Sequence, residues 1–264
     1  YPTRTETKII RDNIEEIVSL FDEETLFVEL GSGSSVKTKI ILRNLPKIKG
    51  YLPIDISEEH LKSSAEKLND EFPQLKIIPV AADYTKEINF PESYYEAGKK
   101  VMFFPGSTIG NFEEKDAKKF LSILRSELNR HGYLLIGIDL QKDVDVLLKA
   151  YNDSQGITAA FNLNILARLN GEFGFNFEIN SFRHRAEYNF SKNRIEMILY
   201  SDKEQTVTGF GITFHFKKGE SIKTEYSHKY TIDGFLNLCE NKFKPEKYWT
   251  DGNRYFALLL LSVA

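Results

Sequence analysis

Glycines and acidic side chains near the start of the chain are spaced in a way that suits a nucleoside. Glu29, Gly31 and Gly33 lie at the end of the apolar run 26–30. Glycines let the backbone approach a ligand closely because no Cβ stands in the way. Asp55 ends the next apolar run, roughly 20 residues further on, where a carboxylate can bind ribose hydroxyls. This spacing predicts a nucleoside-binding edge of a sheet.

The same loop does not complete a dinucleotide motif. That motif needs a third glycine at the helix entrance, and this chain has Val36 there. The order of acidic residue, glycines and acidic strand end resembles instead the class I S-adenosylmethionine methyltransferases, whose ligand has a sulfonium and an amino acid tail in place of a pyrophosphate. A glycine-rich strand-to-helix turn of some other α/β protein is the alternative that this motif alone leaves open.

Two further loops carry groups that suit the same ligand. Asp83 and Tyr84 follow the third apolar run, where a carboxylate can accept from the exocyclic amine of a purine and a ring can stack on it. A solvated loop aspartate is the alternative for Asp83. The run 104–111 contains two glycines and ends at Asn111, which predicts a wall close to both cofactor and substrate. Asn111 could also cap a helix beginning at residue 112 or 113.

These residues require a parallel sheet that gathers strand ends at one edge. Between residues 6 and 139, apolar runs alternate with amphipathic helices, which is typical of βαβ units. Right-handed crossovers place the carboxyl ends of such strands together, where open α/β sheets bind ligands. The expected strands are 26–30, 51–56, 76–81, 100–104 and 133–139, and the expected helices are 36–43, 58–69 and 114–129.

The chain changes character after Leu140. A helical, polar-flanked segment precedes β-branched and aromatic alternation, which predicts an antiparallel sheet. A last helix and strand could then return to the first sheet, which would make the middle segment an insertion. The expected elements are a helical segment at 142–170, strands at 195–200, 205–208 and 212–216, a helix at 232–241 and a strand at 255–261.

Composition excludes several classes of function. The 264 residues include 35 basic and 38 acidic side chains with no basic stripe, so nucleic acid is not an expected partner. Cys239 is the single cysteine and the five histidines lack zinc spacing, so we expect no disulfide framework, no metal site and a cytoplasmic setting. Apolar runs such as 257–261 are too short to span a bilayer, so no membrane association is expected.

Ordered blocks from the first residue to the last strand closely resemble the histidine-specific Nα-methyltransferases of ergothioneine biosynthesis. The blocks are YPTRTE at 1–6, ELGSG at 29–33, GSTIGN at 106–111, AYND at 150–153, GITAAFN at 156–162, IEM at 195–197, TEYS at 224–227 and WTD at 249–251. The resemblance implies S-adenosyl-L-methionine as cofactor, S-adenosyl-L-homocysteine as its product, and L-histidine methylated three times to hercynine. Fusion or coupling to a sulfoxide synthase is the partner relation that it implies.

The resemblance also implies a fold and a set of site residues. The fold is α/β, a Rossmann-like class I methyltransferase sheet of residues 1–140 and 229–264, with a smaller α+β substrate-binding domain of residues 141–228 inserted before the final strands. The implied cofactor contacts are Gly31, Lys37, Asp55, Asp83 and Tyr84, the last replacing the family's frequent Phe. The implied catalytic positions, holding the amino and carboxylate end of histidine, are Asn111 and Tyr151, and the implied imidazole pocket is Met197, Glu225 and Ser227.

Some of these positions read differently without the resemblance, and two rival functions remain. Met197 alone reads as core and Glu225 as an exposed strand charge. The rivals are a methyltransferase acting on a ring nitrogen of 5-thiohistidine, as in ovothiol biosynthesis, and an inactive methyltransferase fold used as a binding module. The family also has a substrate-contacting tyrosine directly before the position of Tyr1 and a further N-terminal helical segment, so we expect an incomplete pocket in the sequence as printed.

Overall fold

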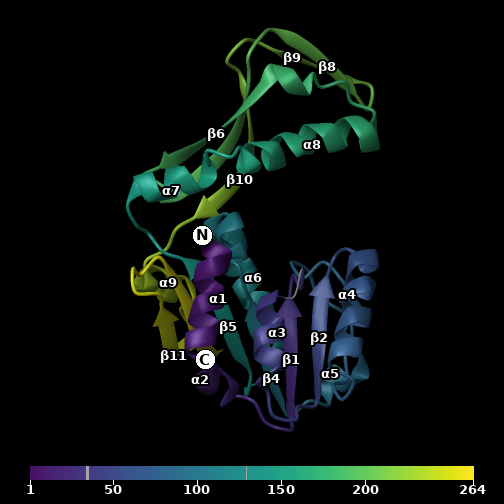
Figure 1. Ribbon diagram of the computed structural model, residues 1–264, viewed down its shortest axis with the longest axis vertical. Coiled ribbons are helices and arrows are strands. Elements are labelled where there is room, and N and C mark those ends of the chain that lie inside the picture. The colour runs from purple at the N-terminus through teal and green to yellow at the C-terminus, as the bar shows by residue number, and fades with distance from the viewer. Residues whose placement is uncertain (34–35, 129) are drawn as a thin grey trace. The chain divides into compact units, whose positions relative to one another are not determined.

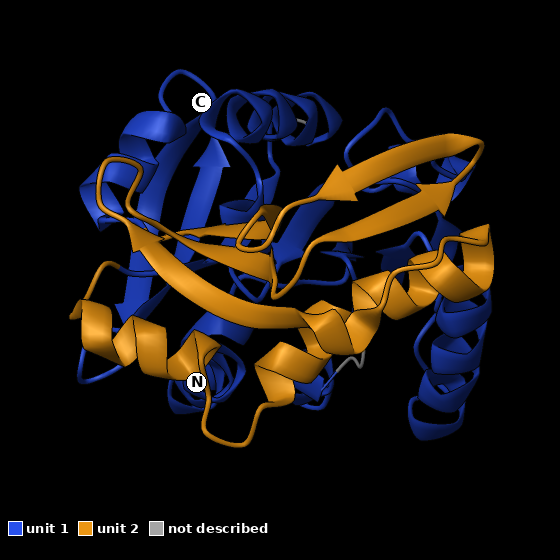
Figure 2. Ribbon diagram, turned by 90° about the horizontal axis from the view of Figure 1, so that it is seen from above, with its two compact units in different colours: residues 1–140, 230–264 blue, residues 141–229 orange. Residues whose placement is uncertain are grey.

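The computed structural model describes residues 1–33, 36–128 and 130–264, which form two compact units. Unit 1 consists of residues 1–140 and 230–264, and unit 2 consists of residues 141–229 (Figure 2). Ser34 and Ser35 of the glycine run, and Asn129 at the expected end of a helix, lie outside the described residues.

Unit 1 is built on a seven-stranded sheet in the order β11-β12-β5-β4-β1-β2-β3 (Figure 1). Strands β1 to β5 are parallel, and β12 runs antiparallel to β5 and β11. The predicted Rossmann-like core and the return of the last strand to it are both confirmed. The strands are β1 Thr25–Leu30, β2 Gly50–Asp55, β3 Val80–Ala81, β4 Lys99–Phe104, β5 Tyr133–Asp139, β11 Phe243–Thr250 and β12 Phe256–Val263.

Side chains of the parallel strands alternate between two apolar layers. Leu26, Val28 and Leu30 of β1 belong to the layer that contains Phe120 of α6, whereas Phe27 of β1 belongs to the layer on the side of α1 and α3. All six residues of β1 are buried, as expected for a strand covered on both faces. The helices of unit 1 are α1 Pro2–Asp12, α2 Ile14–Val18, α3 Val36–Leu42, α4 Glu58–Glu71, α5 Glu92–Tyr95, η1 Thr108–Asn111, α6 Glu114–Glu127 and α9 Ile232–Leu238.

The third strand is much shorter than the expected 76–81. Only Val80–Ala81 pair continuously with β2, although Tyr51 also forms an isolated bridge with Ile77. Pro79 lies between these two points of pairing and has no N–H to donate. The prediction was wrong in extent because proline interrupts the ladder at this outermost strand of the sheet.

Unit 2 contains two antiparallel sheets, where the sequence predicted one. Three strands lie in the order β10-β7-β6, and β8 pairs with β9. Leu166 of α8 packs with Phe182 of β6 and Leu199 of β7 to form the centre of its own apolar cluster. The elements are α7 Val144–Tyr151, α8 Ile157–Phe173, η2 Ile179–Ser181, β6 Phe182–Asn189, β7 Arg194–Ser201, β8 Gln205–Gly209, β9 Ile212–Phe216 and β10 Ser221–His228.

The helical segment expected at 142–170 is divided into two helices. Gly156 has φ +70°, a left-handed conformation that ends the turn between them. The carboxylate of Asp153 accepts from the backbone N–H groups of Ile157 and Thr158 at 2.9 and 2.8 Å, and these bonds lower the pKa of Asp153 to about 2. The ionised Asp153 therefore stabilises the start of α8, whose N-cap residue is Gly156, and the prediction of one continuous helix missed this boundary.

Candidate active site

The loop after β1 is shaped by two glycines in left-handed conformations. Gly31 has φ +73° and Gly33 has φ +41°, which other residues rarely adopt. The backbone N–H groups of Gly31 and Ser32 donate to the carbonyl oxygen of Ile54 at 2.9 and 3.2 Å. These bonds fold the loop over the end of β2, so bare backbone lies at the carboxyl edge of the sheet.

The carboxylate of Asp55 lies beside this loop. Its Oδ2 accepts from the backbone N–H of Gly33 at 3.4 Å, and its Oδ1 accepts from the N–H of Ser57 at 3.0 Å. The Nε2 of His60 lies 3.1 Å from the carbonyl oxygen of Gly33. The structure thus brings together the glycine loop and the acidic strand end that the sequence paired by spacing.

Tyr84 faces the glycine loop, whereas Asp83 is engaged in its own turn. A Cβ built on Gly31 would lie 3.6 Å from the ring and the hydroxyl oxygen of Tyr84, which is ordinary van der Waals contact, so the ring lies directly beside this glycine. The ring packs at 5.7 Å from that of Phe104, and burial raises the pKa of the Tyr84 phenol. The side-chain and backbone donors of Thr85, with the ammonium of Lys86, lower the pKa of Asp83 to about 2.

A cavity of about 220 Å³ lies between the glycine loop and the loop after β4. Cofactor pockets usually enclose roughly 300–1,000 Å³, so this cavity has room for part of a ligand, such as an amino acid tail. Its lining carries both signs of charge, from Glu29 and Lys37. The complete lining is Thr3, Glu29, Gly31, Ser32, Gly33, Val36, Lys37, Pro105, Gly106 and Thr108.

A larger apolar depression lies elsewhere on unit 1. It has a volume of about 390 Å³ and is lined by residues 42, 45–48 and 71–75, which precede β2 and β3. This is the amino-terminal edge of the sheet, whereas α/β sheets bind ligands at the carboxyl ends of their strands. The glycine-lined cavity is therefore the candidate ligand site, although its volume is smaller than that of the apolar depression.

Glu6 of α1 is a buried carboxylate behind the cavity. It accepts from the backbone N–H of Gly106 at 2.9 and 3.1 Å and from the ammonium of Lys37 at 2.5 Å. Burial raises the pKa of Glu6, and Lys37 opposes that effect. Sequence reasoning did not single out Glu6. The sequence feature that could have indicated its burial is its place on α1, within one turn of the buried Ile9 and Ile10.

Glu29 is the second buried carboxylate at this edge. It accepts from the hydroxyl of Thr38 at 2.5 Å and from the phenol of Tyr51. Burial raises the pKa of Glu29 to about 7, although both hydrogen bonds act in the opposite direction. With Lys37 between them, the two acids give the cavity a local excess of acidic groups, which suits a ligand that carries positive charge.

The loop after β4 is held at its base and exposed at its end. Ser107 has φ +58°, and its Oγ accepts from the backbone N–H of Asp139 at 2.8 Å. The carboxylate of Asp139 in turn accepts from the phenol of Tyr1 at 2.8 Å. Asn111 is exposed at the end of η1. Helix α6 has Glu113 as its N-cap, so the capping role considered for Asn111 was wrong.

In unit 2, three side chains form a closed polar triangle. The hydroxyl of Tyr151 lies 2.8 Å from the Oγ of Ser227. The ammonium of Lys229 lies 2.7 Å from the same Oγ and 3.0 Å from the Tyr151 hydroxyl. The sequence predicted Tyr151 and Ser227 but missed Lys229, which is only 2% exposed. The available signal was the alternation Glu225, Ser227, Lys229, which places the three on one face of an extended chain.

A second set of hydrogen bonds fixes the backbone around this triangle. The Nε2 of His184 lies 2.9 Å from the carbonyl oxygen of Tyr151, and its Nδ1 lies 2.9 Å from the amide nitrogen of Asn162. The Oδ1 of Asn162 accepts from the hydroxyl of Thr224 at 2.6 Å. Asn162 is 3% exposed, so the amide is fully engaged away from water. This series of hydrogen bonds links α7, α8, β6 and β10.

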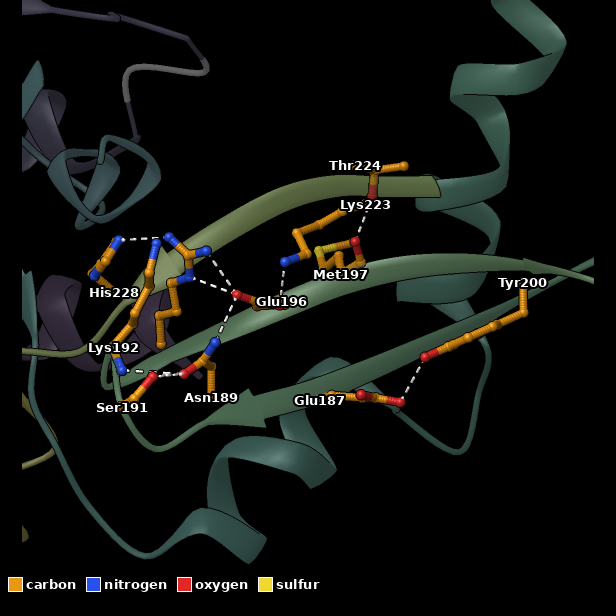
Figure 3. Close-up of polar contacts among 11 residues, drawn as sticks. Glu187, Asn189, Ser191, Lys192, Glu196, Met197, Tyr200, Lys223, Thr224 and His228 are labelled. Carbon is orange, nitrogen blue, oxygen red and sulfur yellow. Dashed lines mark hydrogen bonds and ion pairs between the residues drawn. The ribbon is translucent and has the colours of Figure 1, made fainter. Parts of the chain in front are cut away.

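Met197 and Glu225 lie opposite each other on paired strands. They are register partners of β7 and β10, and a register shift at Thr224 precedes Glu225. Met197 is buried and Glu225 is half-buried. In Figure 3, Thr224 points toward the carbonyl of Met197, to which its hydroxyl donates at 3.0 Å. The structure therefore brings Met197 and Glu225 together on the strand pair that also carries Ser227.

The neighbouring residue on β7 belongs to a charged cluster. Glu196 contacts Lys223 at 2.6 Å and accepts from Asn189 at 3.1 Å, as Figure 3 shows, and it also pairs with Arg194 at 2.7 Å. These partners outweigh burial and lower the pKa of Glu196 to about 2. Because successive strand residues point to opposite faces, this cluster lies away from Met197 and supports the sheet from behind.

Other kinds of site have no support in the described part of the chain. No group of three or more His, Cys, Asp or Glu side chains there could hold a metal ion. Among residues 1–33, 36–128 and 130–264, no helix is long and apolar enough to cross a membrane.

Comparison with known sequences gives a consistent match over the whole chain. A model of the family described as histidine-specific, S-adenosylmethionine-dependent methyltransferases matches residues 1–263. The histidine N-alpha-methyltransferase of Mycolicibacterium smegmatis is 35% identical, over 98% of this chain and 82% of that protein. The ergothioneine biosynthesis protein 1 of Schizosaccharomyces pombe is 29% identical, over 84% of this chain but only 30% of its own length.

Comparison with solved structures supports the fold. An S-adenosylmethionine-dependent methyltransferase from Clostridium acetobutylicum aligns with a TM-score of 0.52, covering 100% of this chain and 92% of that one. The two sequences are 12% identical, so this likeness concerns the fold alone. It agrees with the sheet order of unit 1, in which a parallel core is completed by an antiparallel hairpin.

Proposed function

Because the chain belongs to the histidine-specific, S-adenosylmethionine-dependent methyltransferases, we propose that it transfers three methyl groups to the α-amino nitrogen of L-histidine. The products are hercynine and S-adenosyl-L-homocysteine. The observation that best supports this substrate is the grouping of Tyr151, Ser227 and Lys229 in unit 2, with Glu225 and Met197 on the same strand pair. These groups offer hydrogen bonds and an apolar wall, as a ring with two nitrogens requires.

Unit 1 is proposed to bind S-adenosylmethionine. The residues present fit that group, since the left-handed Gly31 would tolerate no side chain without strain and the adjoining cavity has the size of an amino acid tail. The carboxylate of Asp55 would accept hydrogen bonds from the ribose hydroxyls. Asp83 and Tyr84 would flank the adenine. The ammonium group of Lys37 would contact the amino acid tail of the ligand while it remains paired with Glu6.

The chain's own contribution to the reaction is to bind and orient. S-adenosylmethionine, when bound, supplies a methyl group on a positively charged sulfur. Asn111 and Tyr151 are proposed to hold the amino and carboxylate end of histidine, so that the nitrogen lone pair is directed at the methyl carbon. Such positioning can contribute several kcal/mol to lowering the barrier. The accepting nitrogen needs a free lone pair, so the site has to hold the neutral form of the α-amine, and no covalent nucleophile is required.

Repeated transfer requires that the partly methylated amine can turn within the site. Each added methyl removes an N–H donor from the substrate. A site with few polar contacts to the amine loses little at each step, and Asn111 lies exposed at the end of a short 3₁₀ helix. Mono- and dimethylhistidine are therefore expected to be substrates at least comparable to histidine, and α-N-acetylhistidine is expected to be inert.

A binding and turnover experiment tests this function. Titration calorimetry with S-adenosylhomocysteine should show binding, which an inactive module without a cofactor site would not give. Initial rates with histidine, dimethylhistidine and 5-thiohistidine then identify the acceptor. Faster methylation of 5-thiohistidine than of histidine would favour the ring methyltransferase, and the absence of both cofactor binding and methylation would favour the inactive binding module.

The proposal extends to the setting of the enzyme. The one cysteine, Cys239, is free and buried, as suits a reducing compartment, and we propose a cytoplasmic location. We also propose that the betaine product passes to a sulfoxide synthase, either fused to this chain or separate. The Schizosaccharomyces pombe relative, of which this chain matches only 30%, is long enough to carry further domains.

A further inference from the structure

Lys229 is a buried cation whose place is fixed by the backbone around it. Its backbone N–H donates to the carbonyl oxygen of Asn193 at 2.8 Å, and its own carbonyl oxygen accepts from the side-chain amide of Gln141 at 3.2 Å. Its ammonium lies 4.8 Å from the centre of the Tyr151 ring. The motif blocks give this lysine no role.

The protons of the triangle can be counted. An ammonium group only donates, so Lys229 donates to both the Ser227 hydroxyl and the Tyr151 hydroxyl. The contact between the two hydroxyls consumes one of their two protons. One hydroxyl proton is then left to point out of the triangle, whichever of the two groups donates to the other. A neutral residue able to accept a proton at position 229 would not force this result.

We propose that Lys229 is a positioning residue that makes the triangle a hydrogen-bond donor toward the substrate ring. The inference rests on the proposed function. With Tyr151 donating to Ser227, the Ser227 proton meets the lone pair of one ring nitrogen. Glu225, a carboxylate on the same strand, accepts from the N–H of the other nitrogen. Ser227 and Glu225 therefore select a ring that has one nitrogen with a free lone pair and one N–H group. They also fix which of the two nitrogens carries the proton.

The buried charge of Lys229 also balances the acidic residue of the pocket. Glu225 alone would favour a cationic ring, because an opposite charge stabilises the charged form of a titratable group. Lys229 lies two residues from Ser227 and four from Glu225 along the chain, and it supplies the compensating positive charge at low exposure. Removing it should weaken recognition of the lone pair without altering any residue that touches the cofactor.

The test uses competitive inhibitors of the intact protein with histidine as substrate. Thiazol-4-yl-alanine has a ring nitrogen lone pair but no N–H, and phenylalanine has neither. The wild type should bind the thiazole at least about fivefold more tightly than phenylalanine, as expected for one hydrogen bond. Lys229→Met and Ser227→Ala should both remove this preference, whereas Glu225→Gln should keep it.

A double-mutant cycle shows whether Lys229 acts through Ser227. The variant with both Lys229→Met and Ser227→Ala should lose no more of the thiazole preference than Ser227→Ala alone. Lys229→Arg, which keeps the charge and the donors, should recover part of the preference. The matched control is Lys223→Met. Lys223 is a more exposed lysine on β10 that pairs with Glu196, and its replacement should leave the preference unchanged.

Each result has one meaning. If Lys229→Met binds S-adenosylhomocysteine as the wild type does and keeps the thiazole preference, the inference is wrong. Additive losses in the double variant would also overturn it. If the wild type itself shows no preference for the thiazole, the triangle presents no donor to a ring and the inference again fails. Absence of histidine methylation by the wild type is a different outcome, which contradicts the proposed function instead.

Discussion

Glu6 and Glu29 are buried carboxylates at the carboxyl edge of the sheet, and Glu6 is paired with Lys37. Burial raises the pKa of both, and that of Glu29 reaches about 7. Removing ionised groups from water costs free energy, so these residues are retained at a cost to stability. Their place beside the glycine loop is consistent with a ligand that brings its own positive charge.

The raised pKa of Glu29 makes stability depend on pH in a defined direction. The folded protein binds this proton more tightly than the unfolded chain, so the free energy of unfolding should fall as pH rises from about 4.5 to 7. A shift from 4.5 to about 7 corresponds to a decrease of up to about 3 kcal/mol. Urea denaturation across this range should show the decrease in the wild type and a clearly smaller one in Glu29→Gln.

Glu59→Gln is the matched control for this measurement. Glu59 is exposed on α4, so its replacement should leave the pH dependence as it is in the wild type. Equal slopes for Glu29→Gln and the wild type would mean that Glu29 stays ionised throughout the range.

Asp55 is predicted to carry affinity for the nucleoside. Its carboxylate is held by backbone donors at the end of β2, and a charge-assisted hydrogen bond to a ribose hydroxyl would be lost in Asp55→Ala. S-adenosylhomocysteine binding should weaken by about 1.5–3 kcal/mol with little change in folding. Titration calorimetry measures this, with the exposed Asp70→Ala as control. Unchanged affinity in Asp55→Ala would remove the residue from the cofactor site.

Glu225 is predicted to act on the amino acid substrate alone. It lies on β10 of unit 2 opposite the buried Met197, whereas every residue assigned to the cofactor belongs to unit 1. Glu225→Ala should raise the KM for histidine at least about tenfold, because a ring N–H loses its charged acceptor, while S-adenosylhomocysteine affinity stays within error. Steady-state kinetics and calorimetry on one preparation decide this. Equal losses for both ligands would make Glu225 a structural residue.

At the scale of elements, helix α1 packs closely against the sheet at a glycine, Gly137, which leaves space for the side chain of Glu6. A Cβ on Gly137 of β5 would lie 2.2 Å from the Oε1 of Glu6 and 2.9 Å from the ring of Phe256. Gly137→Ala should therefore destabilise the protein by about 1–3 kcal/mol, because a buried carboxylate and a packed ring must both shift. Urea denaturation should show this loss, and Gly252→Ala, with open space around its Cβ, should show little change. Equal stabilities of the two variants would mean that α1 shifts freely.

The strands that could be predicted from the sequence were those that are buried on both faces of the sheet. Strand β5 has the predicted bounds, β1 and β4 begin one residue earlier than predicted, and β2 begins and ends one residue earlier. These strands could be predicted because strands covered on both faces form continuous apolar runs in the sequence. Strand β6 was missed because only Phe182 and Ala186 are buried among its eight residues. Strand β11 was missed because it is an edge strand with Pro245 and several exposed charged side chains, which is how proteins protect a sheet edge.

The site was predictable to the extent that its residues have distinctive types or a family motif. Asp55 and the glycines could be found by spacing alone, whereas Met197 and Glu225 came from the resemblance. Lys229 and Glu6 were missed because their sequence signals are weak and isolated charged residues are almost always exposed. Their burial depends on partners far away in sequence, such as Tyr151 and Gly106, which only the folded chain brings together.

At the scale of the whole molecule, the insertion leaves the core of unit 1 intact. Leu140 and Tyr230, the residues on either side of unit 2 in the sequence, pair with each other in a parallel bridge, and the N–H of Tyr230 donates to the carbonyl oxygen of Asp139 at 3.0 Å. The chain thus leaves the sheet and returns to it at one point. The sheet of unit 1 therefore accommodates the insertion without a break in any of its strands.

The most direct test of the account is to identify the atom that receives the methyl groups. The purified chain is incubated with L-histidine and S-adenosylmethionine labelled with ¹³C in the methyl group, and the product is analysed by mass spectrometry and two-dimensional NMR. The account predicts a product with three equivalent methyl groups whose protons correlate with the α-carbon. Methyl protons correlated with a ring carbon, or a product that stops at one methyl group, would contradict it.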